Sequence, residues 1–335
     1  MQARLWRVIR NTLITLAAPV IVYLLFFGLT RLMGKQGFGI GPDLRVIIQN
    51  TVYSGFIALA VSYNLTSGRF DFSVGSVLIL SVILGGPLAT QAGFGPVGMV
   101  LTMAVVGMAC GLVSGLLYVL VKLPPMITSL GLAMVFESLG FMLNNSKGIR
   151  LIGRFDLLIF AQFPNNLYLL GVALVILIYL LNFTQFGYNT NSLRTGQKNA
   201  VDVGVNEKKN AVICYVIAGA LMACAGAVYL SQYGYLAPQT GLASISFIMG
   251  AFLPRFIGGS LAKYSDRNIG VIAGAFIQAC ISSGLVKLGV SSSVKTIIDG
   301  AIVLLFLVYV SNSHKLVLRK LQAQKKALAL SDAQA

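Results

Sequence analysis

Long apolar runs separated by short polar segments repeat along almost the whole chain. Windows of about 19 residues pick out ten runs, and helices of this length cross a hydrocarbon core about 30 Å thick. They cover residues 12–33, 46–64, 74–91, 96–121, 126–144, 166–184, 209–231, 243–258, 268–287 and 295–312. The pattern predicts an all-α, polytopic membrane fold with 8–10 transmembrane helices, and ten is the preferred number.

The run at 243–258 differs from the others because Pro254 and Arg255 cut its apolar stretch short. A proline inside a helix removes a hydrogen bond, and an arginine is costly in hydrocarbon. We therefore expect a broken or re-entrant helix here, which needs protein around it at membrane depth.

Composition supports a membrane protein, and the distribution of basic residues predicts its orientation in the membrane. Hydrophobic residues make up 57% of the chain and charged residues 10%, whereas soluble domains carry about 25% charged residues. The net charge is +16, but the basic residues form no basic face and no nucleic-acid-binding motif, so nucleic-acid binding is not expected. Threading ten spans from a cytoplasmic N-terminus puts roughly twice as many basic residues inside as outside, which predicts that both termini are cytoplasmic.

The polar connections are too short to form domains of their own. The longest, 185–208, is expected in the cytoplasm, and 145–165 is expected outside. We therefore predict a single transmembrane domain over residues 1–335 with a basic cytoplasmic tail at 313–335.

Within the longest connection, Gly196 and Gly204 are expected to bound a short helix, because glycine commonly ends helices. Ala200 and Val203 would then present a small apolar face. A solvated linker is the alternative interpretation of this segment.

An internal repeat is suggested by two pairs of segments. Residues 122–131 follow the fourth span and residues 287–300 follow the ninth, so five spans separate them and their orientations are opposite. The segments at 67–76 and 257–266 also fall at similar offsets. Inverted repeats of this kind are common in transporters.

Glu137 lies in the middle of the span 126–144, where a carboxyl group is costly and is a candidate for function. Proton relay or hydrogen bonding to a solute is one interpretation, and a structural partner inside the helix bundle is the favoured one. Thr128, in the same span, is the second candidate for the transport pathway.

Three glycines, Gly107, Gly111 and Gly115, lie four residues apart and are expected to allow a close helix contact. The four cysteines all fall inside apolar runs without C-x-x-C spacing, which predicts neither disulfides nor a metal site. No phosphate-cradling G-x-x-x-x-G-K-[ST] motif and no G-x-S-x-G motif is present. An enzyme is therefore not expected.

The segment TSGRFDFSVGS (66–76) combines charged, aromatic and small residues between two spans. Asp71 or Ser73 is suited to cap the helix that starts near Val74. Gly75 permits a close approach of another segment. A catalytic loop, a hinge and a capped turn are all compatible with this composition.

Four segments together resemble one family, the ribose- and autoinducer-type ABC importer permeases. GRFDFSVGSVLILS (68–81) looks like the family element Gly-Gly-Ile-Asp-Leu-Ser-Val-Gly-Ser, and KLPPMITSLGLAMVFESLGFML (122–143) resembles Val-Pro-x-Phe-Ile-x-Thr-Leu-Gly. FGYNTNSLRTGQKNAVDVGVN (186–206) and LVKLGVSSSVKTIIDGAIVLL (285–305) are similar to two later elements. The four matches follow the order of the family.

The resemblance implies a membrane-spanning subunit of a bacterial inner-membrane importer that moves a small polar solute, first of all a sugar, by alternating access. Its partners would be two ABC ATPase subunits, a second permease subunit and an extracytoplasmic binding protein, with ATP and Mg²⁺ on the ATPase and no cofactor in this chain. The ATPase-coupling loop would contain Gly196, Asn199, Ala200, Asp202, Gly204 and Asn206.

Two departures from the family pattern bear on the solute and the partner. The glycine-rich stretch of the family reads MGAFLPRFIGGSLAKYSDRNIG here (249–270). Where the family often has Gly-Gly-Asn, this chain has Gly196, Gln197 and Lys198 before Asn199. A non-identical second permease is therefore an alternative to a homodimer. A nucleoside or another small solute is the alternative substrate, and an ion-coupled secondary transporter using Glu137 is the alternative mechanism.

Overall fold

The computed structural model describes residues 2–35, 37–305, 308 and 312, and it forms two compact units, Met1–Leu288 and Gly289–Ala335. The long helices of the first unit are α1 (Gln2–Leu32), α2 (Pro42–Thr66), α3 (Val74–Gln91), α4 (Pro96–Val121), α5 (Pro125–Met142), α6 (Asn165–Phe183), α9 (Glu207–Tyr233) and α12 (Arg267–Lys287). In the second unit residues 292–305 are helical.

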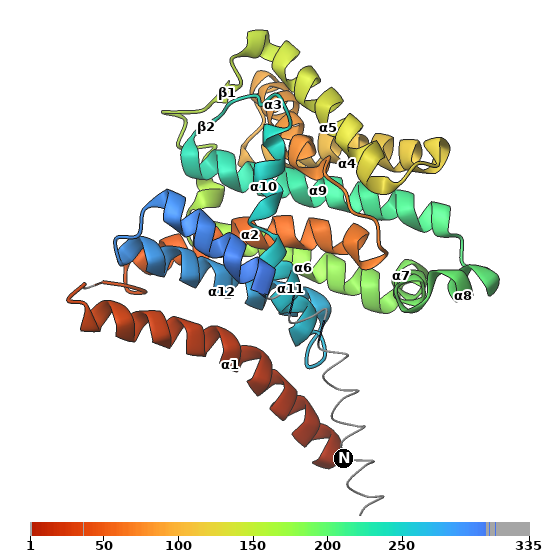
Figure 1. The fold of residues 1–335 in the computed structure, drawn as a ribbon. Helices are drawn as coiled ribbons and strands as arrows, with labels where there is room; N and C mark the ends of the chain where they lie inside the picture. Colours follow the sequence, from red (N-terminus) through yellow and green to blue (C-terminus); the bar gives the residue numbers. More distant parts are fainter. Residues whose placement is uncertain (1, 36, 306–307, 309–311, 313–335) are drawn as a thin grey trace, which may run out of the picture. The chain divides into compact units, whose positions relative to one another are not determined.

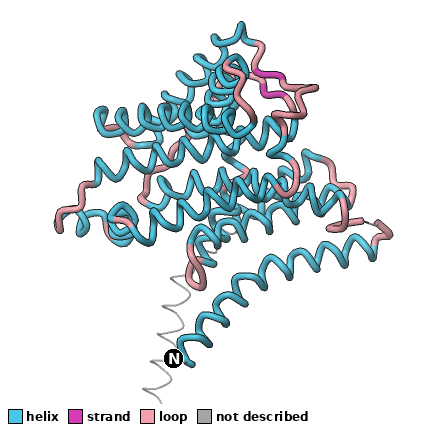
Figure 2. The backbone as a smooth tube through the Cα atoms, turned by 180° about the vertical axis from the view of Figure 1, so that it is seen from behind, coloured by secondary structure: helices cyan, strands magenta, loops and turns pink. Residues whose placement is uncertain are grey.

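Shorter elements connect these helices. They are η1 (Leu143–Ser146), β1 (Ile149–Arg150), η2 (Ile159–Ala161), α7 (Gln185–Thr195), α8 (Gln197–Asp202), β2 (Tyr235–Leu236), η3 (Ala243–Ile245), α10 (Ser246–Met249) and α11 (Phe252–Leu261). The two strands pair antiparallel although α6 to α9 lie between them in the chain, with Ile149 opposite Leu236, and Figure 2 shows the paired strands in magenta.

Nine segments of the described residues are long and apolar enough to cross a membrane, and each overlaps one predicted span. The all-α polytopic fold is thereby confirmed. The tenth predicted span, 295–312, runs into residues outside those described, and the basic tail 313–335 lies outside them entirely. The prediction of a single domain over residues 1–335 stays a prediction.

Local sequence explains where several helices begin. Proline stands at the first position of α2, α4 and α5, where its missing N–H has no helical partner in any case. Asn206 caps α9 by accepting the Lys209 N–H (3.0 Å), and Asp266 caps α12 by accepting the Asn268 N–H (2.9 Å). These caps place the polar loops at fixed points between apolar helices.

Helix α9 forms the centre of the first unit. It packs against α2, α3 and α4, and α12 packs against α1, α2 and α11. In Figure 1, α9 runs between α8 at one end and the β1–β2 strand pair at the other. With 27 residues it is about 40 Å long at 1.5 Å per residue, enough to span a bilayer.

The glycine stripe of α4 lies in the contact with α9, as predicted. A Cβ on Gly107 would meet the carbonyl of Gly219, and a Cβ on Gly111 would meet the carbonyl of Tyr215. A Cβ on Gly115 would meet the Cα of Val212. The two backbones touch along this line because neither helix carries a side chain that would separate them.

The eighth candidate span is broken, as expected, but at another place. The helix stops at Met249 and resumes at Phe252, so the break lies at Gly250–Ala251 and not at Pro254. Pro254 is the third residue of α11, in the first turn, where a proline is tolerated because its N–H needs no helical partner. The glycine, not the proline, marks the interruption.

The proposed echo of residues 67–76 at 257–266 is wrong in register. The first segment leads into the start of α3, whereas the second covers the end of α11 and the turn after it. The helix contacts still agree with an inverted repeat in which α2, α3 and α4 correspond to α9, α11 and α12. In that correspondence the α2–α12 contact matches the α9–α4 contact, and the α3–α4 contact matches the α11–α12 contact. Short similar strings in apolar sequence match by chance.

Candidate functional site

The segment between α6 and α9 folds into two helices instead of a loop. Helix α8 runs from Gln197 to Asp202, between Gly196 and Gly204, so the expected short helix is present. Gly204 has φ +95°, a conformation that side-chain-bearing residues rarely adopt. In Figure 1, α7 and α8 lie together at one end of the first unit.

The apolar face of α8 differs from the expected one. Ala200 is buried (4% exposed) and anchors the helix, whereas Val201 (45%) and Val203 (81%) are exposed. Ala200 and Val203 are three residues apart and would share a face on a continuous helix. Helix α8 ends at Asp202, however, so Val203 already belongs to the turn and points elsewhere. The exposed valines therefore form the outward apolar surface. Of the other predicted residues here, Asn199, Asp202 and Asn206 are exposed.

Polar contacts fasten this segment to α9. The Asn210 amide donates to the Thr190 hydroxyl (2.9 Å), which joins α9 to α7, and both residues are buried. Asn206 caps α9 directly after the Gly204 turn. Helix α9 in turn packs against the long helices α2, α3 and α4, so these contacts connect the α7–α8 segment to the centre of the bundle.

An ion pair joins the start of α9 to the loop between α2 and α3. Arg69 is 2% exposed, and its Nη1 lies 3.7 Å from Oε1 of Glu207. Arg69 can be buried next to the apolar spans because Glu207 supplies the opposite charge that a buried guanidinium needs. It also places the 66–76 segment beside the α8–α9 junction, at the same end of the unit.

Asp71, and not Ser73, holds the turn at the start of α3. The backbone N–H of Ser73 and its hydroxyl both donate to Oδ1 of Asp71, at 2.8 and 2.6 Å. Ser73 occupies the N-cap position but makes no capping bond with its own side chain. Its hydroxyl lies 3.5 Å from that of Ser114 in α4, so the turn is tied to a second helix.

We expect the Asp71→Asn variant to gain stability relative to the wild type as the pH rises. Burial raises the pKa of the Asp71 carboxyl to about 6, although the two hydrogen bonds from Ser73 favour its ionised form. A carboxyl with a raised pKa binds its proton more tightly in the folded state, so wild-type stability falls as the pH rises from about 4 to about 6. At about 1.4 kcal/mol per pKa unit, the loss is about 3 kcal/mol.

Thermal unfolding midpoints of both proteins in the same detergent, measured below and above this pH interval, check the expectation. The asparagine retains an oxygen acceptor for Ser73, so the comparison isolates the charge. A difference between the two midpoints that does not change with pH would contradict the assignment.

Glu137 of α5 binds the backbone of the turn before α10. The Leu242 N–H donates to Oε2 and the Ser244 N–H donates to Oε1, both at 2.8 Å, and Glu137 is 2% exposed. Gly241 and Leu242 both have positive φ, 70° and 67°, and in this turn the N–H groups of Leu242 and Ser244 both face the carboxylate. This geometry fits the interpretation of a structural partner inside the bundle.

Gly75 has a packing role at the same place. A Cβ on Gly75 would collide with the carbonyl oxygen of Ser244. The turn held by Glu137 therefore rests directly on the first turn of α3, so that α3, α5 and η3 meet there. Asp71, Gly75 and Glu137 thus belong to one connected region.

We expect Glu137→Gln to destabilise the protein by about 2–4 kcal/mol. The glutamine amide has one acceptor oxygen, so it can accept only one of the two N–H groups and turns its own NH₂ toward the other. An unsatisfied buried N–H costs about 1–3 kcal/mol, in addition to the lost charged hydrogen bond. The unfolding midpoint measures this loss. Ser138→Ala is the matched control, because Ser138 is exposed and its hydroxyl bonds only within its own helix. An equal, small effect of both changes would contradict the assignment.

Thr128 is not brought together with Glu137. Its hydroxyl donates to the Pro124 carbonyl in the first turn of α5 (3.4 Å). Nine residues of helix separate the two positions by about 14 Å. Their shared role in a transport pathway stays a prediction.

Sequence reasoning missed the partners of these residues. Glu207 as the counter-ion of Arg69, and the backbone of Leu242 and Ser244 as the ligands of Glu137, lie more than 100 residues from their partners. The adjacent Gly241 was the one local signal of an unusual turn, since glycine accommodates positive φ.

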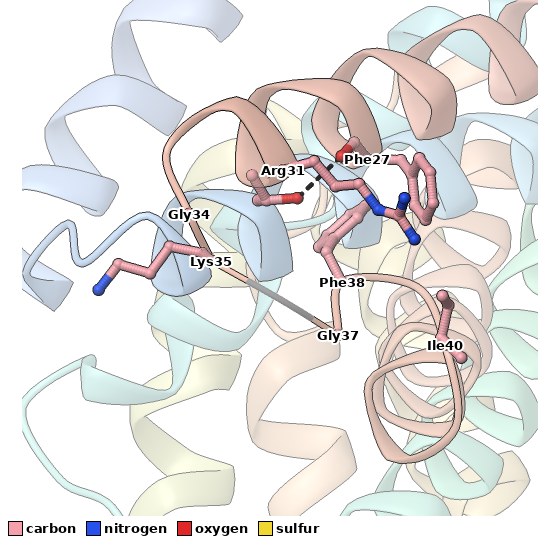
Figure 3. A pocket seen from close by; sticks show the side chains of 8 residues that line it. Phe27, Arg31, Gly34, Lys35, Gly37, Phe38 and Ile40 are labelled. Atoms are coloured by element: carbon pink, nitrogen blue, oxygen red, sulfur yellow. Dashed lines mark hydrogen bonds between the residues drawn. The ribbon is translucent and has the colours of Figure 1, made fainter.

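Two of the hollows at the surface of the first unit are lined by basic residues. One, of about 400 Å³, lies at the turn between α1 and α2, and Figure 3 shows Arg31 beside Phe27 while Lys35 points away from them. The Arg31 guanidinium lies 5.0 Å from the centre of the Phe27 ring. The other, of about 510 Å³, is lined by basic residues of α7, α11 and α12. Across the described residues, no group of three or more His, Cys, Asp and Glu side chains is placed to hold a metal ion.

The proteins that this chain resembles are permease components of transport systems. The profile of the family described as "Branched-chain amino acid transport system / permease component" matches residues 45–307. The autoinducer 2 import system permease protein of Photorhabdus luminescens is 28% identical over 312 residues, covering 91% of this chain and 92% of the relative. The fructose import permease protein of Rhizobium meliloti is 25% identical, covering 86% and 83%.

The ribose import permease protein of Bacillus subtilis is 29% identical over 269 residues, covering 77% of this chain and 81% of the relative. A solved structure described as an inward-facing conformation of a metal-chelate type ABC transporter superposes with a TM-score of 0.53 at 16% identity, covering 90% of this chain and 98% of that chain. At this identity the likeness shows the fold.

These comparisons and the helical architecture agree. Permease components form the membrane-spanning part of ABC importers, and the ATPase activity belongs to separate subunits. The nine candidate spans fit a multi-pass inner-membrane protein. The chain therefore belongs to the family of permease components typified by the branched-chain amino acid transport system, and it is a membrane subunit of an ABC importer.

Proposed function

We propose that this chain is the translocating subunit for a small polar solute of the sugar kind and that α8 is its coupling helix. Both termini lie in the cytoplasm, two ATPase subunits bind there, and a second permease subunit completes the pathway. An extracytoplasmic binding protein delivers the solute. ATP and Mg²⁺ are held by the ATPase subunits, and this chain needs no cofactor of its own.

The observation that carries the proposal is the form and anchoring of α8. A six-residue helix with exposed valines stands at one end of the unit, held by buried Ala200. Apolar side chains on an otherwise polar end are suited to fill a groove on a partner. The contacts of α7 and α9 then carry the motion of that partner to Arg69 and the start of α3.

The names of the relatives support the choice of solute. Two are permeases for the sugars fructose and ribose, and one is a permease for autoinducer 2. The family description names branched-chain amino acids, which makes those solutes the contrasting class. Each Glu137 oxygen already accepts a backbone N–H, which favours a structural role for this carboxylate over a coupling-ion site.

Reconstitution tests the proposal. The chain is purified with its cognate ATPase and binding protein, and uptake of labelled sugars and of leucine into proteoliposomes is measured with and without ATP. We expect ATP-dependent uptake of a sugar that requires the binding protein. Uptake by the chain alone, insensitive to ATP and lost in Glu137→Gln, would favour a secondary transporter instead.

A further inference from the structure

The hollow of about 510 Å³ gathers positive charge from three parts of the first unit. Its lining residues are Leu65, Thr66, Arg194, Arg255, Gly259, Ala262, Lys263 and Arg267. Four of these eight are basic and none is acidic. Arg194 comes from the end of α7, Arg255 from α11, Lys263 from the turn after α11, and Arg267 from the first residue of α12.

In the part of the chain that the structure describes, no carboxylate forms an ion pair with the cations of this hollow. Arg255 Nη2 donates to the Thr66 hydroxyl (3.1 Å), while its Nε is buried and has no hydrogen-bond partner. Arg194 and Arg255 repel each other. Among the described residues neither Arg194 nor Lys263 makes a salt bridge. Arg255 is half-buried, and a guanidinium partly withdrawn from water without an opposite charge is costly.

The nearest acid does not neutralise the cluster. Asp266 precedes Arg267 in sequence, but its carboxylate accepts hydrogen bonds from the Asn182 amide (2.8 Å) and the Asn268 N–H (2.9 Å). Arg267 instead donates to the Asn191 side-chain oxygen at 3.4 Å. The hollow therefore keeps unused donors that point to a missing anion.

Gly259 makes room for the arginine that lies deepest. A Cβ on Gly259 would come within 2.9 Å of Arg255 Nη1. The glycine, one turn after Arg255 on α11, thus lets the guanidinium lie across the helix and into the hollow. The hollow between α1 and α2 has no such arrangement, because there Arg31 is stacked on Phe27 and Lys35 points away (Figure 3).

We infer that this basic hollow, formed by Arg194, Arg255, Lys263 and Arg267, binds a phosphate-bearing anion. Arginine donors suit phosphate oxygens because the planar fork makes two parallel hydrogen bonds, and several cations match a group that carries more than one negative charge. Two sources offer this chemistry: the headgroup of an anionic lipid, for which basic pockets between membrane helices are suited, and a soluble cytoplasmic phosphate compound.

Binding would act on the segment that precedes α8. A phosphate shared by Arg194 and Lys263 would tie the end of α7 to the turn between α11 and α12. Helix α7 ends at Thr195, two residues before α8 begins. The anion would thus hold the position of α8 relative to α11 and α12. This consequence rests on the proposed function, whereas the binding itself does not.

Two arms of one experiment separate the sources. In the first, the full chain in complex with its ATPase is unfolded thermally in detergent while sodium phosphate is titrated against sodium chloride at equal ionic strength. In the second, the complex is taken from nanodiscs of phosphatidylcholine alone or of phosphatidylcholine with phosphatidylglycerol, and the lipids it retains are counted by native mass spectrometry.

We expect wild type to be stabilised by phosphate, to retain phosphatidylglycerol, or both, and Arg255→Gln to weaken this binding about tenfold or more, as loss of a charge-assisted pair predicts. Lys263→Gln and Lys208→Gln form a matched pair: both lysines are exposed, and only Lys263 lines the hollow. Lys263→Gln should weaken binding and Lys208→Gln should not.

Retention of lipid without a response to phosphate assigns the site to a headgroup, and the reverse assigns it to a soluble anion. Equal responses of wild type and Arg255→Gln in both arms would overturn the inference. So would an equal loss in Lys263→Gln and Lys208→Gln, because general surface charge would then explain the binding.

Discussion

Gly111→Leu is expected to lower the yield of folded permease strongly. A Cβ at this position already collides with the Tyr215 carbonyl of α9, and the rest of the side chain has no direction in which to turn within the α4–α9 contact. Backbone atoms cannot move aside as a side chain can, so the cost lies at or above the upper range for overpacking, about 3 kcal/mol. That is a large share of a typical stability of about 5–15 kcal/mol.

The amount of monodisperse protein after detergent extraction measures this effect. Gly171→Leu is the matched control, because Gly171 lies in α6 and nothing stands within 4 Å of a Cβ built there. We expect the control to be extracted as well as the wild type. Normal recovery of Gly111→Leu would show that α4 and α9 do not pack as the structure has them.

Gly204→Val is expected to uncouple ATP hydrolysis from uptake while the protein still inserts and assembles. Gly204 has φ +95° and nothing lies within 4 Å of a Cβ there, so the change strains the backbone without a clash. A β-branched residue is especially unfavourable at positive φ. The turn between α8 and α9 must therefore open, and α8 loses its fixed position on α9.

Uptake and ATP hydrolysis measured on the same proteoliposomes check this result. We expect uptake to fall about tenfold, corresponding to about 1.4 kcal/mol, while hydrolysis continues. Gly204→Asn is the matched variant, since asparagine tolerates positive φ better than other side-chain-bearing residues. It should retain most of the uptake. Unchanged uptake in Gly204→Val would remove the support for α8 as the coupling helix.

Much of the fold could be predicted because it depends on local patterns. Apolar runs set the candidate spans, since any segment that crosses hydrocarbon must be apolar over its whole length. The glycine stripe of α4 and the short helix between Gly196 and Gly204 were predictable for a similar reason. A four-residue spacing marks one helix face, and glycine marks a helix end.

Other features depend on partners far away in the chain and could not be predicted. The break was expected from Pro254 and Arg255, but its position at Gly250–Ala251 could not be predicted, because propensity cannot say which turn of a helix a proline occupies. The apolar face of α8 was misjudged because a one-residue difference in where a helix ends changes which side chains remain exposed.

By itself the sequence determined that the chain spans a membrane, where most spans lie, and which glycines allow close contact, because these follow from hydropathy and spacing along the chain. Only the tertiary structure decided what the polar residues do. Arg69 meets Glu207, Glu137 meets the Leu242 turn, and Arg255 faces an acid-free hollow. A buried charge takes its role from what surrounds it, and those surroundings come from segments that the chain order keeps apart.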